Sequence, residues 1–144
     1  MASTIRHPAQ WLCHHADGTQ VVHDLELSYD PSDPYAIQIT FLLDVDEPDF
    51  VVAWTISRDL LTEGITSWAG DGDVRVQVWV PLPRLVSVEL LDSHDGRWSR
   101  FLARRDDLAD FLRHTYTLVP AGTEQMDVDT AVERLLTGTA PGGE

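Results

Sequence analysis

Two neighbouring segments in which apolar and polar residues alternate, 35–43 and 50–56, place the strongest constraint on the fold of this chain. Every second position holds a large apolar residue: Tyr35, Ile37, Ile39, Phe41 and Leu43 in the first segment, and Phe50, Val52, Trp54 and Ile56 in the second. A period of two is typical of a strand with one buried face. The short, mostly acidic connection 44–49 therefore predicts that the two strands pair as a hairpin.

Further segments extend this strand pattern to most of the chain. We predict strands over residues 20–29, 74–80, 85–91 and 97–103, and one more over 9–15. In residues 74–80 the valines share one face, which places Trp79 on the opposite face. There the indole is either covered by a second layer or available to a subunit interface, where tryptophan is enriched.

Three helices are expected, over residues 58–63, over 104–116 and after Asp127. Ser57 is suited to cap the first helix and Gly64 to end it. The second helix carries one apolar stripe, made of Leu108, Phe111, Leu112 and Thr115. The order of strands, a short helix, more strands and terminal helices predicts an α+β fold with antiparallel sheets.

The composition limits the class of protein. The 144 residues include 24 acidic and 10 basic side chains, all ten of them arginine, for a formal net charge of −14. Such a field repels phosphate groups and anionic lipid surfaces, so nucleic acid is disfavoured as a partner. With 43% hydrophobic residues the chain can bury a core, and we predict one domain over residues 1–137 with a flexible Gly/Pro-rich tail over 138–144.

The chemically reactive residues give no catalytic pattern. Cys13 is the only cysteine, so it has no internal disulfide partner, which fits a reducing compartment. His14 and His15 would point to opposite faces of a strand, a poor geometry for binding one metal ion. We therefore assign no catalytic, cofactor or metal residues; a small hydrolase or metal protein using Cys13 and the histidines is an alternative. With no apolar run long enough for a membrane or signal segment, we expect a cytoplasmic protein.

Charged and aromatic residues supply the candidates for partner contacts. Residues 97–113 form the only locally cationic stretch, and Arg104 and Arg105 lie where a helix dipole disfavours positive charge, which suggests a role in a contact. Arg58 and Asp59 begin the first predicted helix, where they can cap it, pair inside the protein or touch a partner. The full set of candidates is Trp79, Arg58, Asp59, Arg97, Arg100, Arg104, Arg105 and Arg113.

Several short motifs occur in order between residues 29 and 124. They are Tyr29-Asp30-Pro31-Ser32-Asp33-Pro34-Tyr35-Ala36, Trp54, Arg58-Asp59-Leu60-Leu61-Thr62-Glu63-Gly64, Gly72-Asp73-Val74-Arg75-Val76, Phe111-Leu112-Arg113-His114-Thr115 and Val119-Pro120-Ala121-Gly122-Thr123-Glu124. In their order and spacing these motifs resemble the SsgA-like proteins, the sporulation and cell-division regulators of filamentous actinobacteria. The absence of lysine agrees with a GC-rich source.

The resemblance implies both a fold and a role. The implied fold is whirly-like, with two antiparallel β-sheets packed with a short central helix and C-terminal helices, and it assembles as a homotrimer. The implied role is a non-enzymatic adaptor, recruited to division septa, that positions the septum or septal wall synthesis. Its partners would be cell-division or wall-synthesis proteins, such as FtsZ or another SsgA-like protein. Whirly-like relatives outside the family bind single-stranded nucleic acid, and that alternative function would use residues 97–113.

Overall fold

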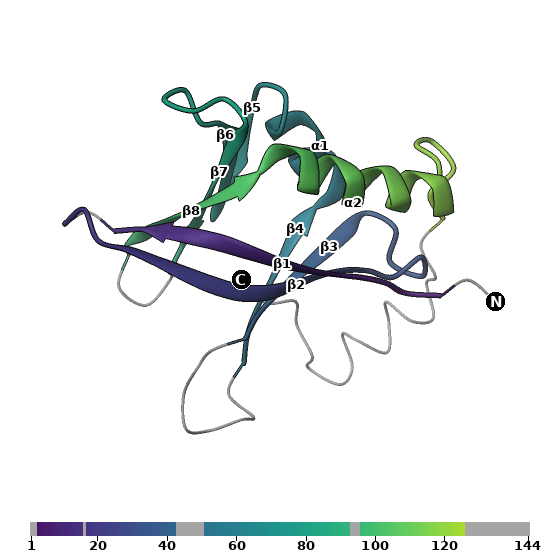
Figure 1. Ribbon diagram of the computed structural model, residues 1–144. Coiled ribbons are helices and arrows are strands. Elements are labelled where there is room, and N and C mark those ends of the chain that lie inside the picture. The colour runs from purple at the N-terminus through teal and green to yellow at the C-terminus, as the bar shows by residue number, and fades with distance from the viewer. Residues whose placement is uncertain (1–2, 16, 43–50, 93–95, 126–144) are drawn as a thin grey trace.

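Strands dominate the protein, whose structure is a computed structural model that describes residues 3–15, 17–42, 51–92 and 96–125. These residues form eight strands and two helices (Figure 1). In chain order they are β1 (Ile5–His14), β2 (Gln20–Tyr29), β3 (Ala36–Leu42), β4 (Val51–Ser57), α1 (Arg58–Gly64), β5 (Trp68–Asp71), β6 (Val74–Val78), β7 (Leu85–Leu91), β8 (Trp98–Arg104) and α2 (Arg105–Leu118). Within these described residues, neither helix combines the length and apolar character that spanning a membrane requires.

The strands form one sheet in the order β4-β3-β2-β1-β8-β7-β6-β5, and every neighbouring pair is antiparallel. The predicted α+β class and antiparallel pairing are confirmed, but one continuous sheet replaces the two sheets that we predicted. Strand β1 is the reason, because its whole length pairs with β2 while Leu12, Cys13 and His14 also pair with β8. Backbone hydrogen bonds therefore continue through the middle, where two packed sheets would meet through side chains alone.

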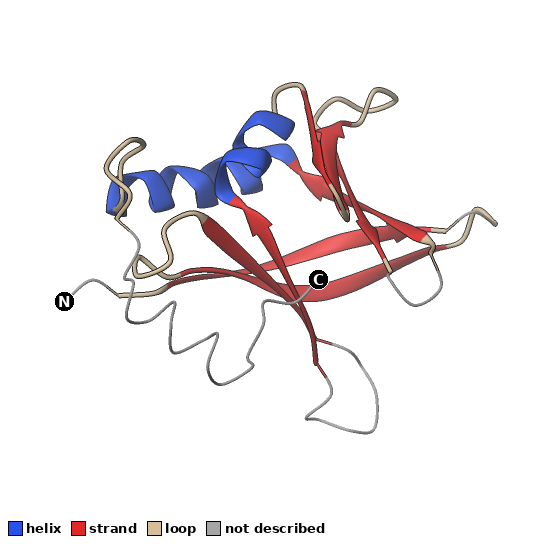
Figure 2. Cartoon of the chain, turned by 180° about the vertical axis from the view of Figure 1, so that it is seen from behind, coloured by secondary structure: helices blue, strands red, loops and turns tan. Residues whose placement is uncertain are grey.

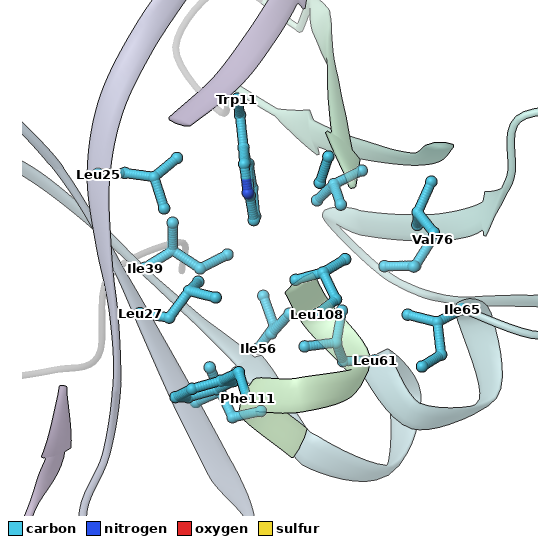
Figure 3. Packing of buried hydrophobic residues seen from close by; sticks show 14 of the residues in the cluster. Trp11, Leu25, Leu27, Ile39, Ile56, Leu61, Ile65, Val76, Leu108 and Phe111 are labelled. Atoms are coloured by element: carbon cyan, nitrogen blue, oxygen red, sulfur yellow. The ribbon is translucent and has the colours of Figure 1, made fainter. Parts of the chain in front are cut away.

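Both helices cover the inner face of the bent sheet (Figure 2). Alternate residues of the strands point toward these helices and form a single core with their apolar stripes. Figure 3 shows the centre of this core, which includes Trp11, Leu25, Leu27, Ile39, Ile56, Leu61, Ile65, Val76, Leu108 and Phe111. The opposite, outer face of the sheet carries no helix in the described chain (Figure 2).

Most predicted elements are confirmed within a few residues. The hairpin of β3 and β4 places Ile37 opposite Ile56 and Ile39 opposite Trp54, as the alternation required. Ser57 Oγ accepts a hydrogen bond from the backbone N–H of Leu60 at 3.1 Å, which confirms the predicted cap of α1. The predicted stripe of α2 is fully buried. Strand β5 was not predicted, and the helix expected after Asp127 lies outside the described residues.

Gly64 does not end α1 in the way that the sequence suggested. It is the last helical residue, the cap residue Ile65 has ordinary helical angles, and Gly64 does not adopt a positive φ. A Cβ atom at Gly64 would collide with Cβ and Cγ1 of Val76 and would lie 2.8 Å from the backbone oxygen of that residue. Glycine is therefore present to let α1 approach β6 closely, and not to allow a left-handed turn.

A substitution at Gly64 separates these two explanations. We expect Gly64→Ala to lower the free energy of unfolding by about 1–3 kcal/mol, because the added methyl group overpacks the contact with Val76. Gly64→Asn should cost at least as much, measured by urea denaturation. A left-handed cap would tolerate asparagine better than alanine, so a milder effect of Gly64→Asn would contradict the packing explanation.

Candidate protein-interaction surface

Arg58, at the start of α1, is enclosed by the protein itself. Its side chain is 1% exposed, and Nη1 donates to the backbone oxygens of Thr115 at 3.2 Å and Val119 at 2.8 Å. Nη2 donates to Oε1 of Glu124 at 3.3 Å. We expected Arg58 among the partner contacts. These internal bonds instead hold the segment after α2 against α1, so the Arg58 side chain is not available to a partner protein.

Aromatic rings complete the surroundings of Arg58. Its guanidinium carbon lies 4.0 Å from the ring centre of Tyr116 and 5.1 Å from that of Tyr29, distances at which the cation is attracted to the ring faces. Burial raises the pKa of the Tyr29 phenol, and the Arg58 charge partly opposes that rise. The neutral hydroxyl donates to the backbone oxygen of Pro34 at 3.0 Å. Asp59, the neighbouring candidate, stays exposed, with its Oδ1 3.5 Å from the Tyr116 hydroxyl.

The cationic stretch 97–113 does not form one patch, because its arginines lie on different elements. Arg97 is exposed before β8, and Arg100 and Arg104 lie on β8 itself. Arg105 and Arg113 belong to α2, on the other side of the sheet. Arg113 is exposed and pairs with Asp110 on the same helix at 2.5 Å. Only the arginines of β8 therefore remain candidates for a shared surface with Trp79.

The structure brings Trp79 and Arg100 together on the outer face of the sheet. Strand β6 ends at Val78, and Trp79 follows it with its ring 4.7 Å from the Arg100 guanidinium and 6.2 Å from the His14 ring. A second pair lies on the same face, with the Arg75 guanidinium 3.9 Å above the ring of Trp98. Trp68 of β5 is 54% exposed and lies beside Gly70. We call Trp68, Arg75, Trp79, Trp98 and Arg100 the tryptophan–arginine face.

This face owes its composition to strand register. Arg75, Glu89 and Arg100 are directly opposite one another across β6, β7 and β8, and Arg100 pairs with Glu89 at 3.7 Å. Alternation places the valines of β6 in the core and Arg75 on the outer side. None of the three tryptophans of the face belongs to the hydrophobic core or packs against it. These indoles are therefore not required to build the interior.

Trp79 and Arg100 were predicted from the sequence as candidates, whereas Trp68, Arg75 and Trp98 were not. The alternation within residues 74–80 could have identified Arg75, because it assigns Arg75 to the face opposite the valines. The alternation within residues 97–103 could have identified Trp98, because it places Trp98 on the same face as Arg100. Trp68 lies on a four-residue strand interrupted by Gly70, which is too short for a period to be recognised. A Cβ atom at Gly70 would lie 3.1 Å from the Trp68 indole, so the missing side chain at this glycine leaves room for the ring.

Cys13 and its neighbouring histidines do not have the properties of a reactive site. Cys13 is buried, and desolvation raises the pKa of its thiol, whereas a nucleophilic cysteine needs a lowered pKa. His14 lies on the outer face beside Trp79, while Cys13 points to the inner face. Within the described ranges, no group of three or more His, Cys, Asp or Glu side chains could hold a metal ion.

The fold and this surface define a small α+β protein, a bent antiparallel sheet with helices on one face and exposed indole and guanidinium groups on the other. The chain belongs to the SsgA family, because residues 24–124 match the family model for "Streptomyces sporulation and cell division protein, SsgA". The resemblance drawn from the ordered motifs is thereby confirmed.

Relatives of known sequence and structure agree with this assignment. The chain is 43% identical over 125 residues to the sporulation-specific cell division protein SsgB of Salinispora tropica, covering 85% of each protein. It is 37% identical to SsgB of Streptomyces coelicolor, covering 76% of this chain and 79% of that protein. A crystal structure of an SsgA-like sporulation-specific cell division protein from Thermobifida fusca superimposes with a TM-score of 0.77 at 33% identity, covering 94% of this chain and 99% of the other. A structure from work on SsgB mutations and longitudinal division in Streptomyces coelicolor gives a TM-score of 0.75 at 31% identity, covering 85% and 93%.

Proposed function

We propose that this chain is a non-enzymatic adaptor of sporulation-specific cell division, which positions the septum or septal wall synthesis through protein–protein contacts. Its relatives are named sporulation-specific cell division proteins. The observation that carries the adaptor role is the tryptophan–arginine face, because it presents an indole that is 54% exposed beside two arginine–indole stacks. Tryptophan and arginine are the residues most enriched among those that dominate binding energy at interfaces.

The partners in this proposal are cell-division or septal wall-synthesis proteins, with FtsZ and another SsgA-like protein as the leading candidates. The chain would act in the cytoplasm and be recruited to division septa. It would assemble as a homotrimer, which places three copies of the tryptophan–arginine face on one particle. Light scattering should then give three times the mass of the chain, and a monomeric mass would contradict this part of the proposal.

The role is tested by deletion and capture. We expect a deletion strain of the source organism to show misplaced or missing septa during sporulation. The tagged chain should retain division or wall-synthesis proteins in a pull-down. Normal septa in the deletion strain, together with failure to retain any of these proteins, would overturn the proposal. Arg113→Gln is a suitable complementation control, because Arg113 is exposed on α2 and lies outside the tryptophan–arginine face.

A second candidate function is single-stranded nucleic-acid binding, favoured by the same face. Bases stack on aromatic rings next to arginines in many proteins that bind single strands, and Trp68 and the Arg75–Trp98 pair have this chemistry. The nucleic acid would bind at the tryptophan–arginine face and not along residues 97–113, since that stretch is divided between β8 and α2. The formal charge of −14 opposes this function, and a filter-binding salt titration without affinity at low salt would exclude it.

A further inference from the structure

A row of charged and polar side chains crosses the outer face of the sheet at the tryptophan–arginine face. The pairing register sets His14 of β1 opposite Arg100 of β8, Arg100 opposite Glu89 of β7, and Glu89 opposite Arg75 of β6. Neighbouring strands lie about 4.8 Å apart, so this row presents one side chain at each step across the sheet. An extended peptide lying across the strands would meet these groups at regular intervals.

The two arginines of the row select the bound group. Arg75 is exposed, and 36% of the Arg100 side chain is exposed although it pairs with Glu89 at 3.7 Å. A guanidinium group binds a carboxylate through two parallel N–H donors, and the charged acceptor strengthens each bond. Exposed apolar side chains lie nearby on the β6–β7 connection, where Val80 is 83% exposed and Leu82 also reaches the surface. The occupant should therefore combine carboxylates with apolar residues.

We propose that the tryptophan–arginine face binds an acidic, partly apolar peptide segment of a partner protein, with one carboxylate on Arg100. This assignment rests on the proposed adaptor function and names the chemistry of its partner. Apolar side chains of the peptide contact the exposed edge of Trp68 and the β6–β7 connection, while Arg75 faces a further carboxylate.

Charge favours a peptide over a nucleic acid on this face. Strands β6, β7 and β8 contain three arginines, Arg75, Arg100 and Arg104, and one acidic residue, Glu89. The chain as a whole has a formal charge of −14, so this cationic region is small within a negative field. A short peptide places a few carboxylates on that region, whereas a nucleic acid would extend one phosphate per nucleotide into the repulsive surroundings.

The test is a binding measurement on the full chain with three fluorescent probes. The first is a short peptide in which pairs of Glu alternate with pairs of Leu, so that each side of the extended chain carries both residue types. The second is the same peptide with Gln in place of Glu, and the third is an oligothymidylate. We expect fluorescence anisotropy to show binding of the Glu peptide and at least about tenfold weaker binding of the Gln peptide. Added salt should weaken the binding of the Glu peptide.

Variants locate the binding on the face. Arg100→Gln should weaken the Glu peptide at least about tenfold, and Arg100→Lys should also weaken it because lysine retains the charge but lacks the planar guanidinium that binds a carboxylate with two donors. Arg113→Gln removes the same charge from exposed α2 and should change the affinity by less than about twofold. If the melting curve shows that Arg100→Gln does not fold, the binding of the Glu peptide is measured with Arg75→Gln instead. Arg75 is exposed, and its substitution should also weaken the binding.

Several outcomes would overturn the assignment. Equal binding of the Glu and Gln peptides, equal losses of affinity for the Glu peptide in Arg100→Gln and Arg113→Gln, or tighter binding of the oligothymidylate would each do so.

A lower oligomer mass for Arg100→Gln with unchanged peptide affinity would show that a second copy of the chain occupies the face. If Arg100→Gln restores septation in the deletion strain, the peptide site is wrong while the adaptor function stands. Normal septa in the deletion strain count against the adaptor function itself.

Discussion

Replacing Arg58 with alanine is expected to lower the free energy of unfolding by about 3–5 kcal/mol, the range observed when one partner of a buried ion pair is removed. The change leaves Glu124 without its cation and deprives the backbone oxygens of Thr115 and Val119 of their donors. It also empties the space beside the Tyr116 ring. Urea denaturation of the full chain measures this loss directly.

Two further variants define what Arg58 contributes. Arg58→Lys retains the charge but cannot place donors on Val119 and Glu124 together, so we expect it to recover only part of the stability. Arg113→Ala removes an arginine from an exposed pair and should stay within about 0.5 kcal/mol of the unsubstituted protein. If Arg58→Ala lowered the free energy of unfolding by less than about 1 kcal/mol, the stabilising role of the buried Arg58 bonds would be contradicted, because arginines in exposed ion pairs give values of that size.

The second large effect is expected at Phe111, in the middle of α2. Its side chain is fully buried between α2 and the inner face of the sheet, as Figure 3 shows, and its ring centre lies 5.6 Å from that of His7 on β1. Phe111→Ala should lower the free energy of unfolding by about 3–5 kcal/mol, since it removes apolar contact and leaves a cavity. The measurement is again the urea midpoint, with the slope checked for two-state unfolding.

His114→Ala provides the matched control on the same helix. His114 is exposed three residues beyond Phe111, so its replacement removes a ring from α2 without opening the core. Alanine also has a higher helix propensity than histidine, and we expect the stability of His114→Ala to change by less than about 0.5 kcal/mol. Similar losses in the two variants would show that α2 is not held by its buried stripe.

The elements of the fold were largely predictable because their signals are local. The alternation at Ile37, Ile39 and Phe41 and the stripe of α2 reveal which side of each element is buried, whatever lies opposite. Strand β5 could not be predicted because its four residues, which include Gly70, are too few to show an alternation of apolar and polar residues. The number of sheets could not be predicted either, since the hydrogen bonds between β1 and β8 join residues about ninety positions apart in the chain.

The candidate site was less predictable, because its residues are distant in sequence. Trp79 and Arg100 were each selected as candidates, but nothing in the sequence joined them to each other or to His14. For Arg58 the sequence left an internal pair and a partner contact both open, since this residue begins a helix. Its true partners, Val119 and Glu124, lie some sixty residues further along the chain.

The sequence by itself determined the strands, the two described helices, the buried side of each and the family, because periodicity, caps and ordered motifs act over a few neighbouring residues. Tertiary structure alone decided that one sheet runs from β4 to β5, that Gly64 serves a close approach to Val76, and that Arg58 is enclosed. It also decided that indole and guanidinium groups from β5 to β8 share one outer face. Strand register and long-range packing set these properties, and neither is encoded in any single segment.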